Sequence, residues 1–232
     1  MFGKGSSLKA GVLGTFAVLV WAADANALNV TPTIMPVAPP TDVTEGMTES
    51  NTAIKLFLET ASTTVEGVVV DILAAGPQVF DDSSDLASLG SLTITGTFAS
   101  YMLHLDSVGT ASRTLMGTVE FDRNIVAILL QDVTRTAVLT LDDSDDDFGA
   151  LGTTYPTGMA SKRGLELDFN DDFIQILDSK TLKVQFSVSK AVDQIRVITQ
   201  PVPEPSALLT FAASGLIVAT AARRKSMAAL LS

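Results

Sequence analysis

Apolar and polar side chains alternate without a break between residues 92 and 98. Leu92, Ile94, Gly96 and Phe98 lie on one side of the pattern, and three threonines lie on the other. A period of two is typical of a β-strand, because successive side chains of a strand point to opposite faces of its sheet. The run therefore predicts a strand with one buried and one solvated face, and it limits the chain to folds that contain a sheet.

Similar patterns recur along the chain. The same alternation is found in three more runs, Tyr101–Leu105, Leu115–Phe121 and Leu182–Val188. Short runs rich in Val, Ile, Thr and Phe predict further strands at Ile54–Leu58, Val65–Val70, Ala137–Leu141, Phe173–Leu177 and Ile195–Thr199. One run is apolar on both faces, as is typical of a central strand: Ile125–Leu130.

These strands predict an all-β fold. About ten short strands with half-polar faces, joined by connectors that contain Gly, Asp or Ser, favour an antiparallel β-sandwich, and a jelly roll is one topology that fits. The connector Asp122–Asn124 is short enough to predict a hairpin between the strands that flank it. A sustained helical period is found only near the two ends of the chain.

The N-terminal 27 residues predict a secretory signal peptide. Lys4 and Lys9 precede a run of thirteen apolar residues, Ala10–Ala22, and Ala25 and Ala27 form a small-x-small cleavage pattern. We expect cleavage after Ala27, with the position after Ala25 as the second choice. Residues 28–50 contain four prolines and no sustained period, so they predict a flexible linker before a single β-domain over residues 51–200.

Three features follow one another in the C-terminal segment 201–232. Pro203 and Pro205 fix their own φ angles and disfavour helix in the residue before each, so this part should be extended. The uncharged stretch Ala207–Ala222 then predicts a single transmembrane helix of roughly 24 Å, which is short for a hydrocarbon core of about 30 Å. The basic cluster Arg223–Lys225 would hold its end on the cytoplasmic side.

This order of parts resembles the PEP-CTERM sorting signal of bacterial exported proteins. The motif residues are Val202, Pro203, Glu204, Pro205 and Ser206, and the basic residues are Arg223, Arg224 and Lys225. The resemblance covers about thirty residues, although the chain continues past the basic cluster to Ser232, where such signals often stop. It implies recognition by an exosortase, a membrane-embedded cysteine protease, with cleavage near the Pro-Glu-Pro motif. An ordinary stop-transfer anchor is the alternative.

The domain itself is similar to a set of uncharacterised exported PEP-CTERM proteins. The residues that carry this weaker resemblance are Tyr101–Gly109, Gly149–Pro156, Arg163–Glu166 and Arg196–Thr199. It implies the same fold and the same export route and suggests no activity.

Charge excludes one class of partner. Residues 28–200 contain ten Lys and Arg against 24 Asp and Glu, a net charge of −14. Such a charge repels nucleic acid and is compatible with divalent cations or cationic surfaces. The chain has no cysteine, which excludes disulfides and thiol chemistry.

Two patterns could carry chemistry. His104 and Asp106 lie two residues apart on a predicted strand, so both should project from its polar face; one histidine without cysteine favours a structural hydrogen bond over a zinc site. Five carboxylates crowd a predicted turn, and their repulsion must be relieved by solvent, by arginine or by a cation such as calcium: Asp142, Asp143, Asp145, Asp146 and Asp147. Their spacing fails the EF-hand pattern, so we favour a solvated turn over a calcium site.

No pair of acids stands out as a glycosidase pair, and no nucleophile elbow is present, so we expect no enzyme activity. The leading hypothesis is an exported structural or interaction protein. It would pass the inner membrane with the secretion machinery and an exosortase, and then reside in the envelope, at the surface or in an extracellular biofilm polymer. The alternative is a carbohydrate-binding module acting on exopolysaccharide, which would need Tyr101 or Tyr155 exposed as a stacking platform.

Overall fold

The computed structural model describes residues 28–87, 89, 92–131, 140–157, 163–167, 171–189 and 191–201. Eleven strands and three short helices make up this part of the chain. The strands are β1 (Asn29–Val30), β2 (Ile34–Pro36), β3 (Ile54–Val70), β4 (Ile72–Leu73), β5 (Gln78–Phe80), β6 (Leu92–Asp106), β7 (Arg113–Glu120), β8 (Ile125–Leu130), β9 (Phe173–Ile176), β10 (Thr181–Val188) and β11 (Val192–Thr199). The helices are α1 (Ser83–Ala87), α2 (Thr140–Asp143) and α3 (Asp145–Phe148).

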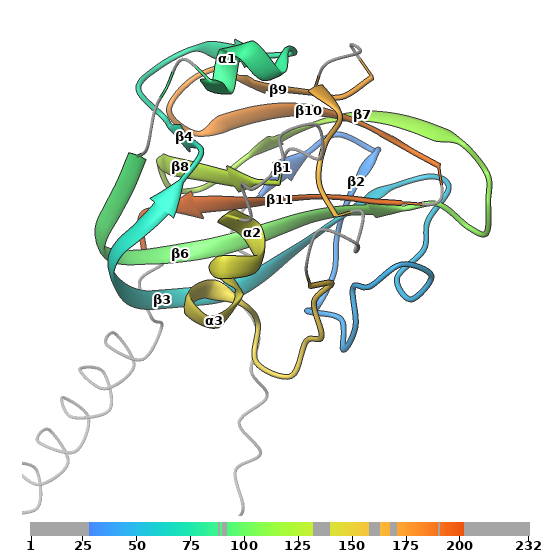
Figure 1. Cartoon of the computed structure of the whole chain (residues 1–232), viewed down its shortest axis with the longest axis horizontal. Helices are drawn as coiled ribbons and strands as arrows, with labels where there is room; N and C mark the ends of the chain where they lie inside the picture. Colours follow the sequence, from blue (N-terminus) through green and yellow to red (C-terminus); the bar gives the residue numbers. More distant parts are fainter. Residues whose placement is uncertain are drawn as a thin grey trace, which may run out of the picture.

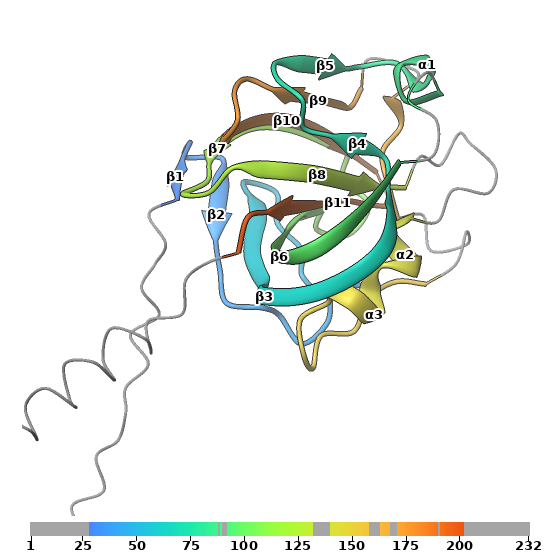
Figure 2. The ribbon, with the colours of Figure 1, turned by 90° about the vertical axis from the view of Figure 1, so that its left-hand side faces the viewer.

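The strands form two sheets that face each other (Figure 1). The five-stranded sheet has the order β1-β7-β10-β9-β5, and the six-stranded sheet has the order β2-β3-β6-β11-β8-β4. All pairings are antiparallel except that of β2 with β3, which is parallel. Figure 2 shows β9 and β10 in one layer and β3 and β6 in the other. The all-β sandwich predicted from the alternating runs is confirmed at this level.

The core lies between the sheets because each contributes its apolar face. Leu182, Val184 and Phe186 of β10 are buried there, while Lys183 and Gln185 lie half-buried on the other face of the strand. The alternation therefore predicted the orientation of β10 correctly. β8 is also as predicted, since it lies between β11 and β4 and is apolar on both faces.

The six-stranded sheet has a second apolar cluster on its outer face. Met102, Leu129, Leu141, Phe148 and Ile198 belong to this cluster. Helices α2 and α3 lie against β8 and β3 on this side and cover it. From Ala99 to Asp106, β6 is therefore buried on both faces, and the solvated face expected for His104 and Asp106 is wrong.

β3 is longer than the two strands predicted for its region. Ile54–Leu58 and Val65–Val70 are parts of one strand of 17 residues, which pairs with β6 through three shifts of register. One shift falls between Leu58 and Thr60 and leaves Glu59 without a Cα partner in the pairing with β6. Shifts of this kind bend a strand and re-aim the extra side chain, so β3 can curve around the sheet.

The connector Asp122–Asn124 does not form the predicted hairpin, because β7 and β8 belong to different sheets. The amides that flank the connector bond elsewhere: Phe121 N–H donates to the Lys180 carbonyl, and Ile125 N–H donates to the Ser179 carbonyl. The loop between β9 and β10 thus takes the hydrogen bonds that a hairpin would have used. The chain crosses from one sheet to the other at this point.

The segment 28–50 is not the linker predicted from its prolines. β1 pairs with β7, β2 pairs with β3, and Val43 is fully buried. Ile34 and Val43 pack into the domain, while Pro36 ends an edge strand, where a missing N–H is tolerated. The folded domain therefore begins near residue 28 rather than at residue 51.

Several predicted features lie outside the described residues. These are the signal peptide with Ala25 and Ala27, the sorting motif 202–206, the helix 207–222 and the basic cluster 223–225. None of the helices in the described part of the chain is long and apolar enough to span a membrane. Of the strand predicted at Ala137–Leu141, only Thr140 and Leu141 are described, and they lie in α2.

Candidate functional site

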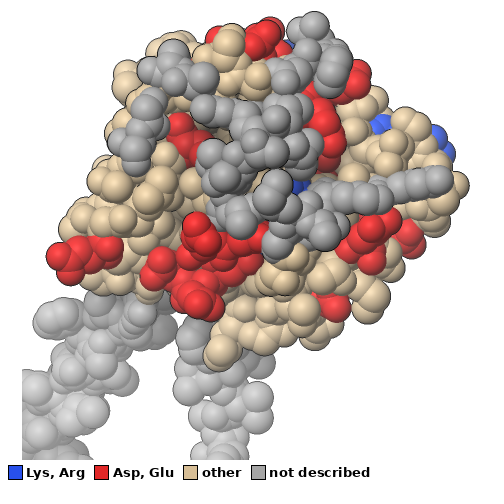
Figure 3. Space-filling view, in the orientation of Figure 1, with Lys and Arg blue, Asp and Glu red and all other residues tan. Residues whose placement is uncertain are grey.

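The five acids of the predicted turn lie on α2 and α3. Figure 3 shows acidic side chains gathered on this face of the molecule. Asp143, Asp146 and Asp147 are exposed, whereas Asp142 and Asp145 contact arginine side chains beneath the helices. Arginine therefore balances part of the crowded charge, which is one of the three forms of relief expected from the sequence.

Arg196 of β11 forms the centre of this contact. Its guanidinium is fully buried and donates two hydrogen bonds of 2.8 Å to the carboxylate of Glu59 on β3. It also donates to Asp145 Oδ1 at 2.8 Å and to the hydroxyl of Ser144. Burial by itself lowers the pKa of Arg196, but the charges of Glu59 and Asp145 outweigh it and raise that pKa.

Arg163 provides a second guanidinium beside Arg196. We call the two arginines and the acids Glu59, Asp142 and Asp145 the ion-pair network. It is fully buried and donates to both carboxylate oxygens of Asp145, at 2.7 and 3.0 Å, and to Asp142 Oδ1 at 3.1 Å. Tyr155 lies beside both arginines, with its ring centre 5.4 and 5.7 Å from the two guanidinium carbons. Its hydroxyl donates to Glu59 at 2.7 Å, and burial followed by the charge of Glu59 raises the pKa of this phenol.

The ion-pair network fastens α2, α3 and the loop at Arg163 to the outer face of the six-stranded sheet. Each of its guanidinium groups is held by at least one carboxylate at bonding distance. Paired charges of this kind satisfy one another in a dry environment. The network therefore has a structural role, which is to hold the helices on the sheet. Its acids are not among the residues that could bind a metal ion in the described part of the chain.

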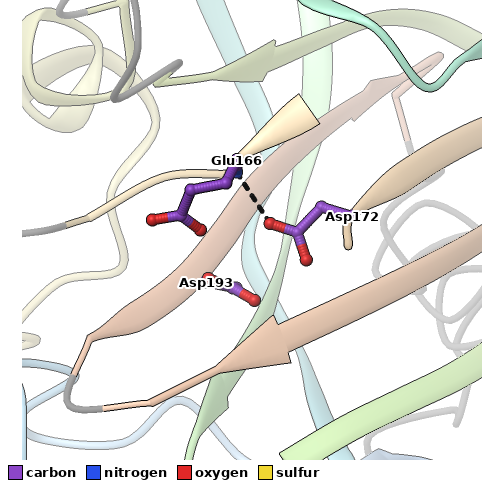
Figure 4. A group of neighbouring side chains, drawn as sticks. All are labelled: Glu166, Asp172 and Asp193. Atoms are coloured by element: carbon purple, nitrogen blue, oxygen red, sulfur yellow. Dashed lines mark hydrogen bonds between the residues drawn. The ribbon is translucent and has the colours of Figure 1, made fainter. Parts of the chain in front are cut away.

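Three other acids converge where the two sheets approach each other. Glu166 lies on the loop after Arg163, Asp172 precedes β9, and Asp193 lies on β11. One carboxylate oxygen of each lies within 4.8 Å of those of the other two, and the side chains point toward a common centre in Figure 4. We call these residues the carboxylate cluster.

The burial of Asp193 follows from the register of β11. Ile195 and Val197 point into the core between the sheets, so the residue two positions before Ile195 points there as well. Asp193 is 1% exposed, and neither of its carboxylate oxygens accepts a hydrogen bond from a described group at normal distance and angle. A buried carboxylate in this state is costly and needs compensation.

Asp172 is better satisfied. It is fully buried and accepts hydrogen bonds from the Ser187 amide at 2.7 Å and from the Glu166 amide at 2.8 Å. Burial raises the pKa of Asp172 to about 7, against the effect of these amides, and the charge of Glu166 adds to the rise. Burial, then the charges of Asp172 and Glu166, raise the pKa of Asp193 well above its usual range.

The carboxylate cluster can therefore do one of two things. It can retain protons that the carboxyl groups share, or it can hold a cation that neutralises the carboxylates. Oxygen-only donors suit a hard cation such as calcium or magnesium.

His104 and Asp106 do not form a reactive pair. The Nδ1 atom of His104 lies 2.9 Å from Nε2 of Gln194, which also donates to the Val43 carbonyl. Burial lowers the pKa of His104 to about 4, so the ring is neutral near pH 7. Asp106 accepts the Gly46 amide at 2.6 Å, and burial raises its pKa. Both residues hold the segment 42–50 against β6, in the structural role favoured for His104.

Neither predicted stacking residue offers a free platform. Tyr101 is buried in the core against Phe121, with ring centres 5.1 Å apart. Tyr155 is half-buried, and its ring lies beside Arg163 and Arg196.

Comparisons of the chain with protein-family models, with curated proteins and with solved structures find no match.

Proposed function

We propose that this protein is exported and that its β-sandwich serves as a structural or interaction module of the cell envelope or of an extracellular polymer. An exosortase would process it at the motif Pro203–Pro205. The observation that carries the proposal is the order of signals in the sequence: a short apolar N-terminal helix with small residues after it, and a motif, helix and basic cluster at the C-terminus.

The limits of the folded domain support this reading. β1 begins at Asn29, two residues after Ala27, and β11 ends at Thr199. The Gln200 amide still donates to the Asn124 carbonyl at 3.0 Å, and the motif begins two residues later, at Val202. Cleavage after Ala27 and again near Pro203 would therefore leave all eleven described strands in the released product.

The exposed acids support an interaction role. Asp143, Asp146 and Asp147 project from α2 and α3, and Figure 3 shows further acidic side chains on the same face. With a net charge of −14 over residues 28–200, this face would attract cationic groups or polyvalent cations that bridge it to an acidic polymer. The carbohydrate-binding alternative has less support, because Tyr101 is buried and Tyr155 is occupied by two guanidinium groups.

The test uses the full-length chain in a bacterial host that has an exosortase. Replacing Pro203, Glu204 and Pro205 with Ala should leave an uncleaved form in the membrane fraction, because Ala lets helix extend through the recognition segment. A matched control replaces the exposed residues Pro32, Pro39 and Glu45 with Ala and should be processed like the wild type.

A second variant separates recognition from retention. With neutral residues in place of Arg223, Arg224 and Lys225, the C-terminal segment should be translocated completely across the membrane, because the positive charges that hold its end on the cytoplasmic side are lost. If the Pro203–Pro205 variant is trimmed and released like wild type, the motif is only a linker and the exosortase proposal is wrong.

A further inference from the structure

We propose that the carboxylate cluster of Glu166, Asp172 and Asp193 is a calcium site that joins the two sheets of the sandwich. This goes beyond the proposed function and does not depend on exosortase processing. The site differs from the acidic turn, whose half-buried members Asp142 and Asp145 contact arginine.

The first observation is convergence from three separate elements. β11 belongs to the six-stranded sheet, Asp172 directly precedes β9 of the five-stranded sheet, and Glu166 lies on the loop 163–167. Their carboxylate oxygens lie within 4.8 Å of one another, a spacing that allows all three to reach one ion. Figure 4 shows the three side chains around a common centre.

The second observation is the unsatisfied side chain of Asp193. It is almost completely buried and is directed into the carboxylate cluster, and neither of its oxygens accepts a hydrogen bond of normal distance and angle from a described group. The ion-pair network offers a direct contrast, because Glu59, which is equally buried in its side chain, accepts four hydrogen bonds. A carboxyl group buried in this way must either keep its proton or have a positive charge in contact with it.

Described basic residues do not supply that charge. Neither Asp172 nor Asp193 forms a salt bridge with a Lys or Arg in the part of the chain that the structure describes. A divalent cation would neutralise the repulsion between the two and would also supply the contact that Asp193 lacks.

The donors select the kind of cation. Three carboxylates provide up to six oxygens, and calcium takes six to eight oxygen ligands in flexible geometry, whereas magnesium demands a near-ideal octahedron. The chain has no cysteine, and its one histidine contacts Gln194, so softer metals find no preferred ligand here. Asp172 and Asp193 are buried while Glu166 is half-buried, so Glu166 marks the side from which an ion would enter.

The experiment measures thermal unfolding of the purified full-length chain near neutral pH, in calcium chloride and in excess chelator. Calcium should raise Tm by several degrees, because it binds the folded state only. Titration calorimetry should show binding of one ion per chain, and magnesium at the same concentration should have a smaller effect.

Asp193→Asn is the decisive variant. It keeps the shape of the side chain but removes one charge, so its Tm without calcium should equal or exceed that of wild type, and calcium should no longer raise it. Asp147→Asn is the matched control, because Asp147 is exposed on α3, and it should respond to calcium like wild type. Should Asp193→Asn fail to fold, Asp172→Asn provides the same comparison by calorimetry.

Two outcomes would overturn the proposal. One is an unchanged wild-type Tm with no binding heat in calcium, which would mean that the carboxyl groups share protons instead. The other is a calcium response that Asp193→Asn retains and Asp147→Asn loses, which would place the ion on the acidic turn.

Discussion

Arg196 on β11 and Glu59 on β3 meet above the strand that separates them, β6, through two hydrogen bonds of 2.8 Å each. Both side chains are completely buried. The contact is possible because the register shift between Leu58 and Thr60 leaves Glu59 off the ladder. Ser100 of β6 completes it by donating to Glu59 at 2.6 Å. The register shift in β3 thus places Glu59 where it can pair with Arg196.

Arg196→Met should destabilise the fold by about 3–5 kcal/mol, because it leaves Glu59 buried without its charged partner and removes one of the two arginines that contact Asp145. Chemical denaturation of the full-length chain measures this directly. Arg113→Met is the control, since Arg113 is exposed and its guanidinium donates to the adjacent Ser112 carbonyl, and we expect a change within about 0.5 kcal/mol. Equal effects of the two substitutions would mean that the ion-pair network does not stabilise the fold.

Asp145→Asn should cost about 2 kcal/mol, because Asp145 accepts charged hydrogen bonds from both Arg163 and Arg196. Asp147→Asn, on the exposed side of the same helix, should leave the free energy of unfolding unchanged or raise it slightly. Urea titrations of both variants test this. If Asp147→Asn lowered the free energy of unfolding more than Asp145→Asn, the acidic turn would have a role other than its ion pairs with arginine.

Because the pKa of His104 is lowered in the folded protein, we expect the protein to lose stability in acid. Its pKa in the folded protein is about 4, below the ordinary value of 6.5, so the unfolded chain binds more protons between these values. The contribution of His104 to the free energy of unfolding is complete above pH 6.5. It is lost as the pH falls toward 4, by about 3 kcal/mol in total.

His104→Gln should remove this dependence. Asp172, whose pKa is raised, acts in the opposite direction, so the quantity to measure is the difference between wild type and variant at each pH. Relative to the variant, wild type should lose stability from pH 6.5 to about pH 4. A constant difference over that range would show that His104 is not buried in its neutral form.

Gly164→Ala should be strongly destabilising. Gly164 has φ +138°, and an added Cβ would lie 1.9 Å from the Gln131 carbonyl oxygen. The backbone would have to move, and we expect a cost above about 2 kcal/mol. Gly152→Ala is the control, because its φ of +84° is strained but nothing lies within 4 Å, so about 1 kcal/mol is expected there. Similar losses at both positions would mean that the loop 163–167 adapts freely.

Export predicts a new N-terminus. Mass spectrometry of the protein recovered outside the cytoplasm should find Leu28 as the first residue, or Asn26 if the second cleavage position is used. A retained Met1 would contradict signal-peptide cleavage. Ala27→Leu provides the control, since a large side chain breaks the small-x-small pattern and should shift cleavage to the position after Ala25.

The strands were predictable because apolar and polar residues alternate along a half-buried strand, and this alternation shows which side chains face the core. In Leu182–Val188 every second side chain is apolar, and these residues face the core. How strands divide between two sheets has no such local signal. The connector Asp122–Asn124 is as short as a hairpin loop, and only its hydrogen bonds to residues 179 and 180 show that it crosses between the sheets.

The functional groups were harder to predict because they are assembled from distant parts of the chain. Arg196 and Glu59 are 137 residues apart, and charged residues are ordinarily expected at the surface. Asp193 did leave a signal. It precedes Ile195 and Val197 by two and four residues, so extending that strand backwards places it on the buried face. The predicted strand began at Ile195 and so excluded it.

The place of β11 in the sheet has a consequence for the order of folding. β11 is the last strand of the described chain, yet it lies between β6 and β8 and divides the six-stranded sheet. The sheet cannot reach this order until residues 192–199 have been made, so Glu59 has no Arg196 to pair with until 137 further residues have followed it. Pairing across so long a stretch of chain is slow. On the export route proposed above, a chain whose central strand pairs last would still be unfolded when its N-terminal part enters a secretion channel.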